Sequence, residues 1–150
     1  MKKQMASVLL VEDNPDDREL AMLAFEEVGL RQGVVACEDA EQALEQLRKW
    51  ETKPDAGGMA RRPDLILLDI KLPGDSGFRV LEAVRANRFT RFVPVVMLSS
   101  SSEESDVMKS YETGANSYIR KPVNFEQFVE VARELKMYWL TLNVTPSSVG

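Results

Sequence analysis

Short apolar runs alternate with segments of helical periodicity from one end of the chain to the other. The runs predict strands near residues 7–11, 34–37, 64–69, 94–98 and 117–119. Apolar residues at three- and four-residue spacing predict helices near 15–28, 39–50, 77–87, 103–112 and 124–139. The central runs are apolar without alternation, which is typical of strands buried on both faces. This order of elements predicts an α/β fold, a doubly wound parallel sheet with helices on both faces.

Several helix boundaries and one long break are marked chemically. Asn14 followed by Pro15 predicts an N-cap and a proline at the first helical position. A serine or asparagine three residues before a glutamate or glutamine predicts a capping box at two later helices, Ser101 with Glu104 and Asn124 with Gln127. Residues 50–63 carry prolines and adjacent glycines and predict a surface loop before the third strand.

Length and charge narrow the class of protein. We expect one domain over residues 1–143, with an extended last helix, and a flexible tail at 144–150. The net charge of −5 argues against nucleic acid as a partner. No apolar stretch approaches the roughly 20 residues that span a bilayer, and the basic first residues lack the apolar core of a signal peptide. We therefore expect a cytoplasmic protein with no membrane partner.

Two residue types exclude whole classes of chemistry. The chain has no histidine, which removes Ser-His-Asp and Cys-His catalysis and imidazole metal sites. Its one cysteine, Cys37, cannot form an internal disulfide. Cys37 ends an apolar run and is therefore predicted to be a buried apolar side chain rather than a reactive thiol.

Polar residues follow four of the five predicted strands. Glu12 and Asp13 follow the first strand, Asp69 the third, Ser99 the fourth and Lys121 the fifth. In a sheet ordered 2-1-3-4-5 these four strands are neighbours, so the side chains converge at the carboxyl edge of the sheet. A solvated strand end is the ordinary alternative for any one of them, but their agreement favours a common site.

The residue types at these strand ends predict the chemistry of the site. Carboxylates and a backbone carbonyl are the ligands of a hard divalent cation such as Mg²⁺. Lys121 supplies a positive charge and Ser99 a hydroxyl donor for the oxygens of a phosphoryl group. Asp69 would be the nucleophile, because phosphoryl transfer depends mainly on positioning and charge neutralisation.

The motifs occur in a recognisable order. They are Val11–Asn14, Leu68–Gly74 with Gly77, Met97–Ser100, Gly114–Ala115, Tyr118 and Lys121–Pro122. With this spacing, nearly the whole chain resembles the receiver domain of bacterial response regulators in two-component systems. The resemblance implies a flavodoxin-like (βα)5 fold with strand order 2-1-3-4-5.

The resemblance also assigns roles. Asp69 would be the phosphoacceptor for a sensor histidine kinase in a phosphorelay. Mg²⁺ would be held by Glu12 through water, by Asp13, by Asp69 and by the backbone carbonyl of Lys71. Lys121 and a serine, Ser99, would bind the phosphoryl oxygens. The chain would then be a phosphoacceptor signalling domain rather than an enzyme, with only slow self-catalysed phosphorylation and dephosphorylation.

The same resemblance implies a switch. Tyr118 would move inward when Ser99 shifts toward the phosphoryl group, and the Lys121–Pro122 peptide bond would be cis. Because only residues 144–150 follow Asn143, we expect no output domain. Output would then pass through protein–protein contacts, phosphate relay or dimer exchange.

The last helix carries more apolar residues than one face can bury. One stripe covers the sheet, namely Phe125, Phe128, Val129, Ala132, Leu135 and Trp139. Five further residues lie off that stripe and predict a partner face: Val131, Met137, Tyr138, Leu140 and Leu142. A tail that folds back on its own domain is the alternative.

The pattern of residues 136–143 resembles single-domain regulators associated with bacterial phytochromes. This resemblance implies a homodimer through the fourth helix, the last strand and the fifth helix. It also implies a kinase partner of the bacteriophytochrome type.

Three other classes fit the chain less well. An aspartyl-phosphate phosphatase would need a second acid two residues after the nucleophile, where Lys71 stands. A flavin-binding domain would need a phosphate-cradling loop after the first strand, where Glu12 and Asp13 would repel a phosphate. A pseudo-receiver would lack a site residue, and none is missing.

Overall fold

A five-stranded parallel sheet forms the centre of the molecule in the computed structural model, which describes residues 7–52 and 62–146. Its strands are β1 (Val8–Val11), β2 (Val34–Cys37), β3 (Leu65–Leu68), β6 (Val95–Ser99) and β7 (Ser117–Arg120). They lie in the order β2-β1-β3-β6-β7 and every neighbouring pair is parallel. Counted along the chain this is the predicted order 2-1-3-4-5, so the predicted fold class is confirmed.

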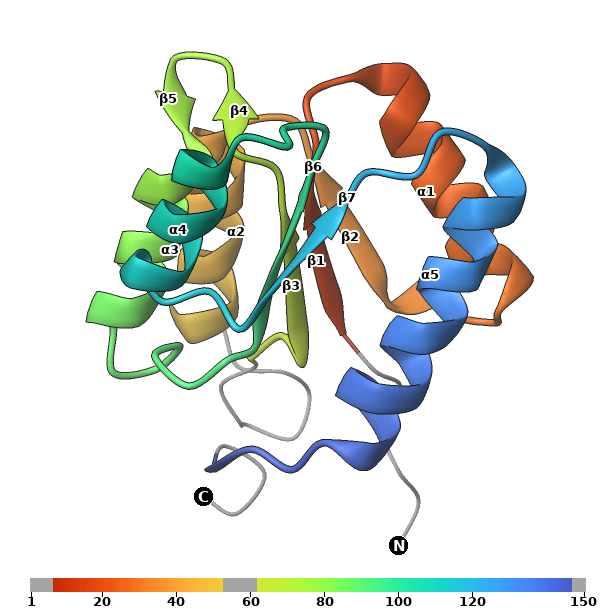
Figure 1. The fold of residues 1–150 in the computed structure, drawn as a ribbon. Coiled ribbons are helices and arrows are strands. Elements are labelled where there is room, and N and C mark those ends of the chain that lie inside the picture. The colour runs from red at the N-terminus through yellow and green to blue at the C-terminus, as the bar shows by residue number, and fades with distance from the viewer. Residues whose placement is uncertain (1–6, 53–61, 147–150) are drawn as a thin grey trace, which may run out of the picture.

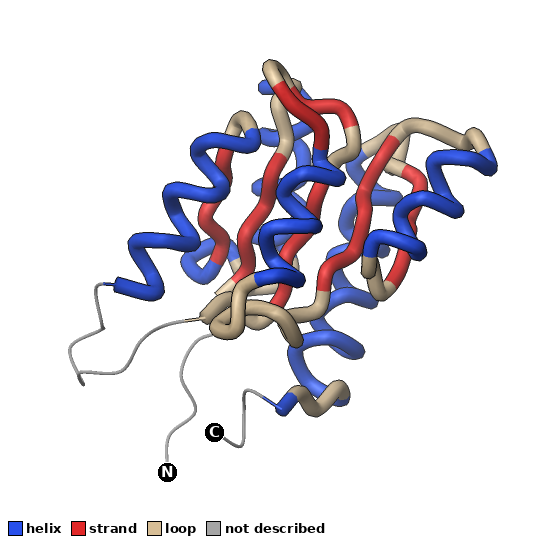
Figure 2. The backbone as a smooth tube through the Cα atoms, turned by 90° about the vertical axis from the view of Figure 1, so that its left-hand side faces the viewer, coloured by secondary structure: helices blue, strands red, loops and turns tan. Residues whose placement is uncertain are grey.

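Helices cover both faces of the sheet. They are α1 (Pro15–Glu27), α2 (Ala40–Thr52), α3 (Gly77–Ala86), α4 (Glu104–Thr113) and α5 (Phe125–Met137). Helices α2, α3 and α4 lie on one side of the sheet and α1 and α5 on the other (Figure 1). Seen from the side of α3 and α4, the strands run behind the helices (Figure 2). Among the described residues, no helix has the length and apolarity to cross a membrane.

Each central strand contributes side chains to two hydrophobic cores, one on each face of the sheet. Successive side chains of a strand point to opposite faces. Leu9 and Val11 of β1 belong to the core cluster under α2 and α3, whereas Val8 and Leu10 belong to the cluster under α1 and α5. All four are at most 1 % exposed, which explains why the run is apolar without alternation.

Two of the three predicted caps have the expected bonds. The Asn14 side chain accepts hydrogen bonds from two backbone N–H groups at the start of α1, and Asn124 accepts one from Gln127 N at 2.9 Å. The predicted capping box at Ser101 and Glu104 does not form, so this prediction is wrong. Helix α4 begins at Glu104 with Glu103 as its N-cap, because the Ser101 hydroxyl is used by the preceding loop.

The structure contains elements that periodicity missed. A short antiparallel hairpin, β4 (Lys71–Leu72) and β5 (Asp75–Ser76), turns at Gly74, whose φ is 74°. A 3-10 turn, η1 (Arg31–Gly33), precedes β2, and a π-helical turn, η2 (Tyr138–Leu142), follows α5. The hairpin strands and η1 have two or three residues each, and η2 is a single turn, so none of them shows a run or a period of its own.

Two predicted boundaries also change. Helix α2 continues to Thr52, and the rest of the loop predicted at 50–63 lies largely in 53–61, outside the described residues. On α5, Phe128, Val129, Ala132 and Leu135 are buried as predicted, but Phe125 is 38 % exposed. Phe125 is the first residue of its helix, and its side chain lines a surface groove instead of the core.

Candidate functional site

The predicted residues meet at the carboxyl edge of the sheet. Val11 and Leu68 are register partners, so Glu12 and Asp69 leave the sheet at the same level. The Asp69 backbone N–H donates to Val11 O at 3.2 Å, which ties the two strand ends together. The five residues Glu12, Asp13, Asp69, Ser99 and Lys121 are called the strand-end site below.

Lys121 is the electrostatic centre of this site. Its ammonium nitrogen lies 2.8 Å from Glu12 Oε1, 3.0 Å from Asp69 Oδ2 and 3.2 Å from Asp17 Oδ2, and its side chain is 10 % exposed. Sequence reasoning missed Asp17. The available signal was its place in the first turn of the helix that follows Glu12 and Asp13.

Three carboxylates of the site could hold a metal ion. One oxygen each of Glu12, Asp13 and Asp69 lies within 4.8 Å of the others. Glu12 and Asp69 are buried and Asp13 is exposed, so the cluster opens to solvent on one side. Oxygen donors of this kind fit a hard divalent cation that keeps some of its water. Lys71 lies two residues beyond Asp69 in β4, and its carbonyl as a ligand stays a prediction.

Burial and charge pull the ionisation of these groups in opposite directions. Burial raises the pKa of Glu12 above its usual value, more than the hydrogen bond from Lys121 lowers it. Burial would lower the pKa of Lys121, but the hydrogen bond to Glu12 and the charge of Asp69 outweigh it and raise that pKa. The lysine therefore stays protonated and ready to neutralise a phosphoryl group.

The loop after β1 is held by α1. Glu12 Oε2 accepts from Asn14 N at 3.0 Å, which fixes the second oxygen of the carboxylate. Arg18 Nη1 donates to the carbonyl oxygens of Glu12 at 2.9 Å and Asp13 at 3.4 Å. The Asn14 backbone thus orients the Glu12 carboxylate, and the Arg18 side chain holds the backbone that carries both acids.

The loop after β6 links the predicted switch residues. Ser99 is 2 % exposed, and its Oγ accepts from Ser101 N at 3.2 Å. The Tyr118 hydroxyl donates to Ser101 O at 2.9 Å, and the Tyr118 ring is half-buried against the core cluster under α2 and α3. Ser101 Oγ donates to Asp106 Oδ2 at 2.6 Å and accepts from Glu103 N at 3.2 Å. Ser101 therefore connects Ser99, Tyr118 and α4.

A glycine allows the chain to pass close to the nucleophile. A Cβ at Gly77 would overlap the carbonyl oxygen of Asp69, and Gly77 N donates to Ile70 O at 2.6 Å. Any side chain at this position would displace the backbone that carries Asp69.

The predicted cis bond is wrong. No cis peptide bond occurs in the part of the chain that the structure describes, so Lys121–Pro122 is trans. The trans form of an X-Pro bond is favoured by about 0.5–1 kcal/mol. Lys121 is aimed by its three carboxylate partners instead.

The predicted partner face is only partly exposed. Met137, Tyr138 and Leu142 are 55 %, 49 % and 62 % exposed. Val131 and Leu140 are half-buried against the core cluster under α1 and α5. The tail therefore folds back at two of the five positions and leaves three apolar side chains in solvent.

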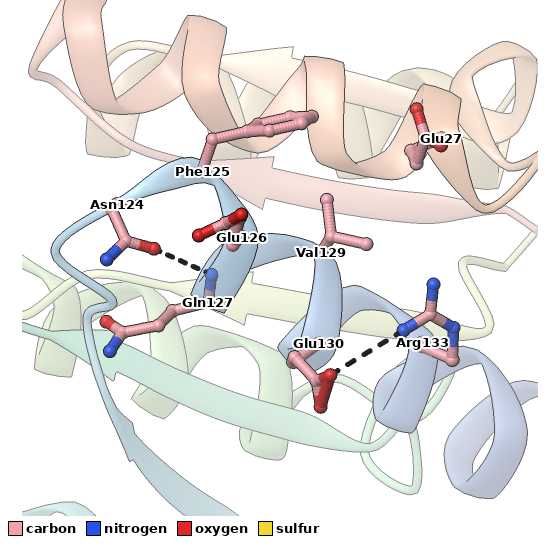
Figure 3. A pocket seen from close by; sticks show the side chains of 8 residues that line it. All are labelled: Glu27, Asn124, Phe125, Glu126, Gln127, Val129, Glu130 and Arg133. Carbon is pink, nitrogen blue, oxygen red and sulfur yellow. Dashed lines mark hydrogen bonds and ion pairs between the residues drawn. The ribbon is translucent and has the colours of Figure 1, made fainter.

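A groove between α1 and α5 lies apart from this chemistry. It is lined by eight residues, Glu27, Asn124, Phe125, Glu126, Gln127, Val129, Glu130 and Arg133 (Figure 3). None of these belongs to the strand-end site.

Residues 8–133 match the family model of the response regulator receiver domain. The chain belongs to this family. Receiver domains are signalling domains of two-component systems and take phosphoryl groups from histidine kinases. The acidic cluster, the sheet order and the family model agree with one another.

Curated receiver proteins match most of the chain. The chain is 37 % identical to the probable methanogenesis regulatory protein FilR2 of Methanothrix harundinacea over 139 residues. This alignment covers 93 % of this chain and 86 % of that protein. The chain is 31 % identical over 144 residues to response regulator Rcp1 of Synechocystis sp., covering 94 % and 93 %. The chain spans about half (48 %) of PhoB of Escherichia coli, a phosphate regulon transcriptional regulatory protein that it also matches.

Solved phytochrome response regulators have the same fold. The phosphorylated cyanobacterial phytochrome response regulator RcpA superimposes with a TM-score of 0.82 and 33 % identity, covering 95 % of this chain and 99 % of that one. The bacteriophytochrome response regulator RtBRR gives 0.71 and 43 %, covering 95 % and 85 %. The Mn²⁺-bound form of Rcp1 gives 0.77 and 29 %, covering 94 % and 99 %. The structural relatives of this receiver thus include regulators of phytochrome systems.

Proposed function

We propose that Asp69 accepts a phosphoryl group from a sensor histidine kinase with Mg²⁺, and that the receiver then signals through protein–protein contacts in the cytoplasm. The observation that carries this proposal is the position of the Lys121 ammonium, 3.0 Å from Asp69 Oδ2 beside a three-carboxylate cluster. A solvated strand end would not have a buried lysine held against it.

Asp69 and Lys121 act directly on the phosphoryl group during its transfer. An Asp69 oxygen forms a bond to phosphorus while the bond from phosphorus to the kinase histidine nitrogen breaks. The imidazole leaves with the electrons of that bond and takes up a proton. Lys121 neutralises the charge on the phosphoryl oxygens. Bound Mg²⁺, held by Glu12, Asp13, Asp69 and the Lys71 carbonyl, would supply further charge neutralisation.

The switch uses the loop that Ser101 organises. When Ser99 Oγ donates to a phosphoryl oxygen, its bond from Ser101 N, 3.2 Å long in this structure, has to change. Tyr118 is bonded to the carbonyl of the same Ser101, so a shift of this residue alters the position of the ring. Phosphorylation would therefore bias α4 and Tyr118 between two arrangements.

The decisive experiment is phosphorylation by a small donor. We expect acetyl phosphate with Mg²⁺ to add one phosphoryl group to the protein, measured by intact mass, and EDTA to abolish it. Asp69→Asn should form no adduct, whereas Asp75→Asn, an exposed acid outside the cluster, should react as the unaltered protein does. No adduct on the unaltered protein, or an undiminished adduct on Asp69→Asn, contradicts the proposal.

The partners are proposed on different grounds. The phytochrome regulators among the structural relatives support a kinase of the bacteriophytochrome type. The test is phosphotransfer from a panel of autophosphorylated histidine kinases, in which a phytochrome kinase should react fastest. We further propose that the receiver unit ends at Asn143, after η2, and that the three exposed residues Met137, Tyr138 and Leu142 belong to a homodimer interface with α4 and β7.

A further inference from the structure

Lys121 has no unused hydrogen-bond donor in this structure. An ammonium group carries three N–H donors. Three carboxylates lie within bonding distance of it, Glu12 at 2.8 Å, Asp69 at 3.0 Å and Asp17 at 3.2 Å. The ammonium is thus surrounded by acids from the loop after β1, the end of β3 and the first turn of α1.

Two of these three acids also belong to the proposed metal site, and the third, Asp17, does not. Glu12 and Asp69 belong to the carboxylate cluster, and Asp69 is the proposed phosphoacceptor. A cation at the cluster would draw both of them away from Lys121 and would also repel the ammonium. Asp17 lies outside that cluster, so its contact with Lys121 does not compete with the cation.

The first turn of α1 fixes the backbone position of Asp17. It follows Pro15 in the first turn of α1, and its backbone N–H donates to Asn14 Oδ1 at 3.0 Å. The positive end of the helix dipole attracts its carboxylate toward the first turn. Its side chain is 34 % exposed, so its carboxylate lies at the solvent side of Lys121, whose own side chain is 10 % exposed. By contrast, the lysine has a flexible four-carbon stem.

We propose that Asp17 is a positioning residue for the phosphoryl transfer. This role rests on the proposed function: Asp17 holds Lys121 toward Asp69 once a cation engages Glu12 and Asp69. When Asp69 is phosphorylated, a phosphoryl oxygen takes the place of Asp69 Oδ2 as the acceptor. The contact between Lys121 and Asp17 persists through the transfer and keeps the lysine side chain in one rotamer.

Asp16 provides a matched control. It is the preceding residue, carries the same charge in the same helical turn and is exposed, and the ion-pair partners recorded for Lys121 do not include it. Asp16→Ala and Asp17→Ala therefore remove equal charge from α1, but only the second removes a contact to Lys121.

The test is the rate of Mg²⁺-dependent phosphorylation by acetyl phosphate, followed by intact mass. Asp17→Ala should slow the reaction about tenfold, because a Lys121 that is no longer held toward Asp69 loses much of its charge-assisted hydrogen bond to the phosphoryl oxygen in the transition state. Asp17→Asn, which keeps a neutral acceptor, should fall in between, and Asp16→Ala should stay within about twofold of the unaltered protein. Urea unfolding without Mg²⁺ shows whether each variant folds. If Asp17→Ala does not fold, the phosphorylation rate of Asp17→Asn tests the inference instead.

A double-mutant cycle separates positioning from a general effect of charge. In a Lys121→Ala background, Asp17→Ala should have no further effect on the rate, because the residue through which it acts is gone. The same further loss in both backgrounds would overturn the inference, and so would a faster reaction of Asp17→Ala, since Asp17 would then compete with the phosphoryl group for Lys121.

The two proposals fail separately. If the unaltered protein forms the adduct and Asp17→Ala reacts like Asp16→Ala, the positioning role is wrong and the proposed function stands. If the unaltered protein forms no adduct, the proposed function itself is wrong.

Discussion

At the scale of single residues, buried ionic groups are the feature to explain. Glu12 is 2 % exposed and Asp69 6 % exposed, and an isolated buried carboxylate costs several kcal/mol. Lys121 compensates both acids through direct contacts. Among the described residues, every buried side-chain nitrogen or oxygen has a hydrogen-bond partner. The site is therefore satisfied as it stands, yet it carries more acids than bases and is prepared for a cation.

Mg²⁺ should stabilise the protein through Asp13. A ligand that binds only the folded state adds about 2.7 kcal/mol to the free energy of unfolding at one hundred times its dissociation constant. Asp13→Asn should lose this gain, measured by urea unfolding with and without Mg²⁺. Without the metal, Asp13→Asn should be at least as stable as the unaltered protein, because it relieves repulsion within the cluster. Asp75→Asn is the control and should keep the full response; an equal response in Asp13→Asn would contradict the assignment.

Cys37 should make the stability depend on alkaline pH. Burial, and next the charge of Asp39, raise the pKa of the Cys37 thiol to about 11, against about 8.5 in an unfolded chain. The folded thiol keeps a proton that the unfolded thiol loses. Its contribution is therefore complete below about pH 8.5 and is lost toward pH 11, at up to about 1.4 kcal/mol per pH unit.

Urea unfolding across this pH range tests the effect. The free energy of unfolding should fall more steeply with pH in the unaltered protein than in Cys37→Ala. The alanine variant also leaves a small cavity, but that cost is the same at every pH. Parallel curves for the two proteins would show that Cys37 does not titrate as expected.

At the scale of elements, Arg85 joins the end of α3 to two loops. Its Nε donates to Gly114 O at 2.8 Å, its Nη1 to Val93 O at 2.7 Å, and its Nη2 to Asn116 Oδ1 at 2.8 Å. Gly114 has a φ of 119° and ends α4. Arg85 thus satisfies a carbonyl at the end of α4 and holds the turn before β7, the strand that carries Tyr118.

Arg85→Met should destabilise the protein by about 2–4 kcal/mol, because several hydrogen bonds of a partly buried guanidinium are lost together. Arg79→Met is the control on the same helix. Arg79 makes one ion pair with Asp75 and its side chain is 61 % exposed, so its loss should cost less than about 1 kcal/mol. Urea midpoints at constant slope give both values. Equal losses in the two variants would show that Arg85 does not join these elements.

The elements also show how far periodicity predicts a fold. The five helices were predicted within a few residues because each is long enough to show its period, and the five strands of the sheet because each is a short, mainly apolar run. The hairpin β4–β5 and the turn η2 were missed, since each hairpin strand has two residues and η2 is a single turn. The cap at Ser101 failed because its hydroxyl bonds to Asp106 and Glu103 N, two local contacts that the spacing to Glu104 does not reveal.

At the scale of the whole molecule, the exposed residues of α5 and η2 predict self-association. Replacing Tyr138 and Leu142 together by Ser should convert a homodimer into a monomer, because both are about half or more exposed and contribute apolar area to the proposed interface. Light scattering measures the mass. Val123→Ser is the control, since Val123 is 84 % exposed but lies before α5. A monomeric unaltered protein at micromolar concentration would overturn the dimer.

The sequence by itself determined the layers and the strand ends of this receiver. Apolar strands and amphipathic helices are local patterns, and a parallel sheet brings the residues after its strands to one edge, so Glu12, Asp13, Asp69, Ser99 and Lys121 could be named in advance. Only the tertiary structure decided that Asp17 reaches Lys121 across 104 residues of chain and that Lys121–Pro122 is trans. The contact between Asp17 and Lys121 depends on how α1 packs against α5, and no local period encodes that packing.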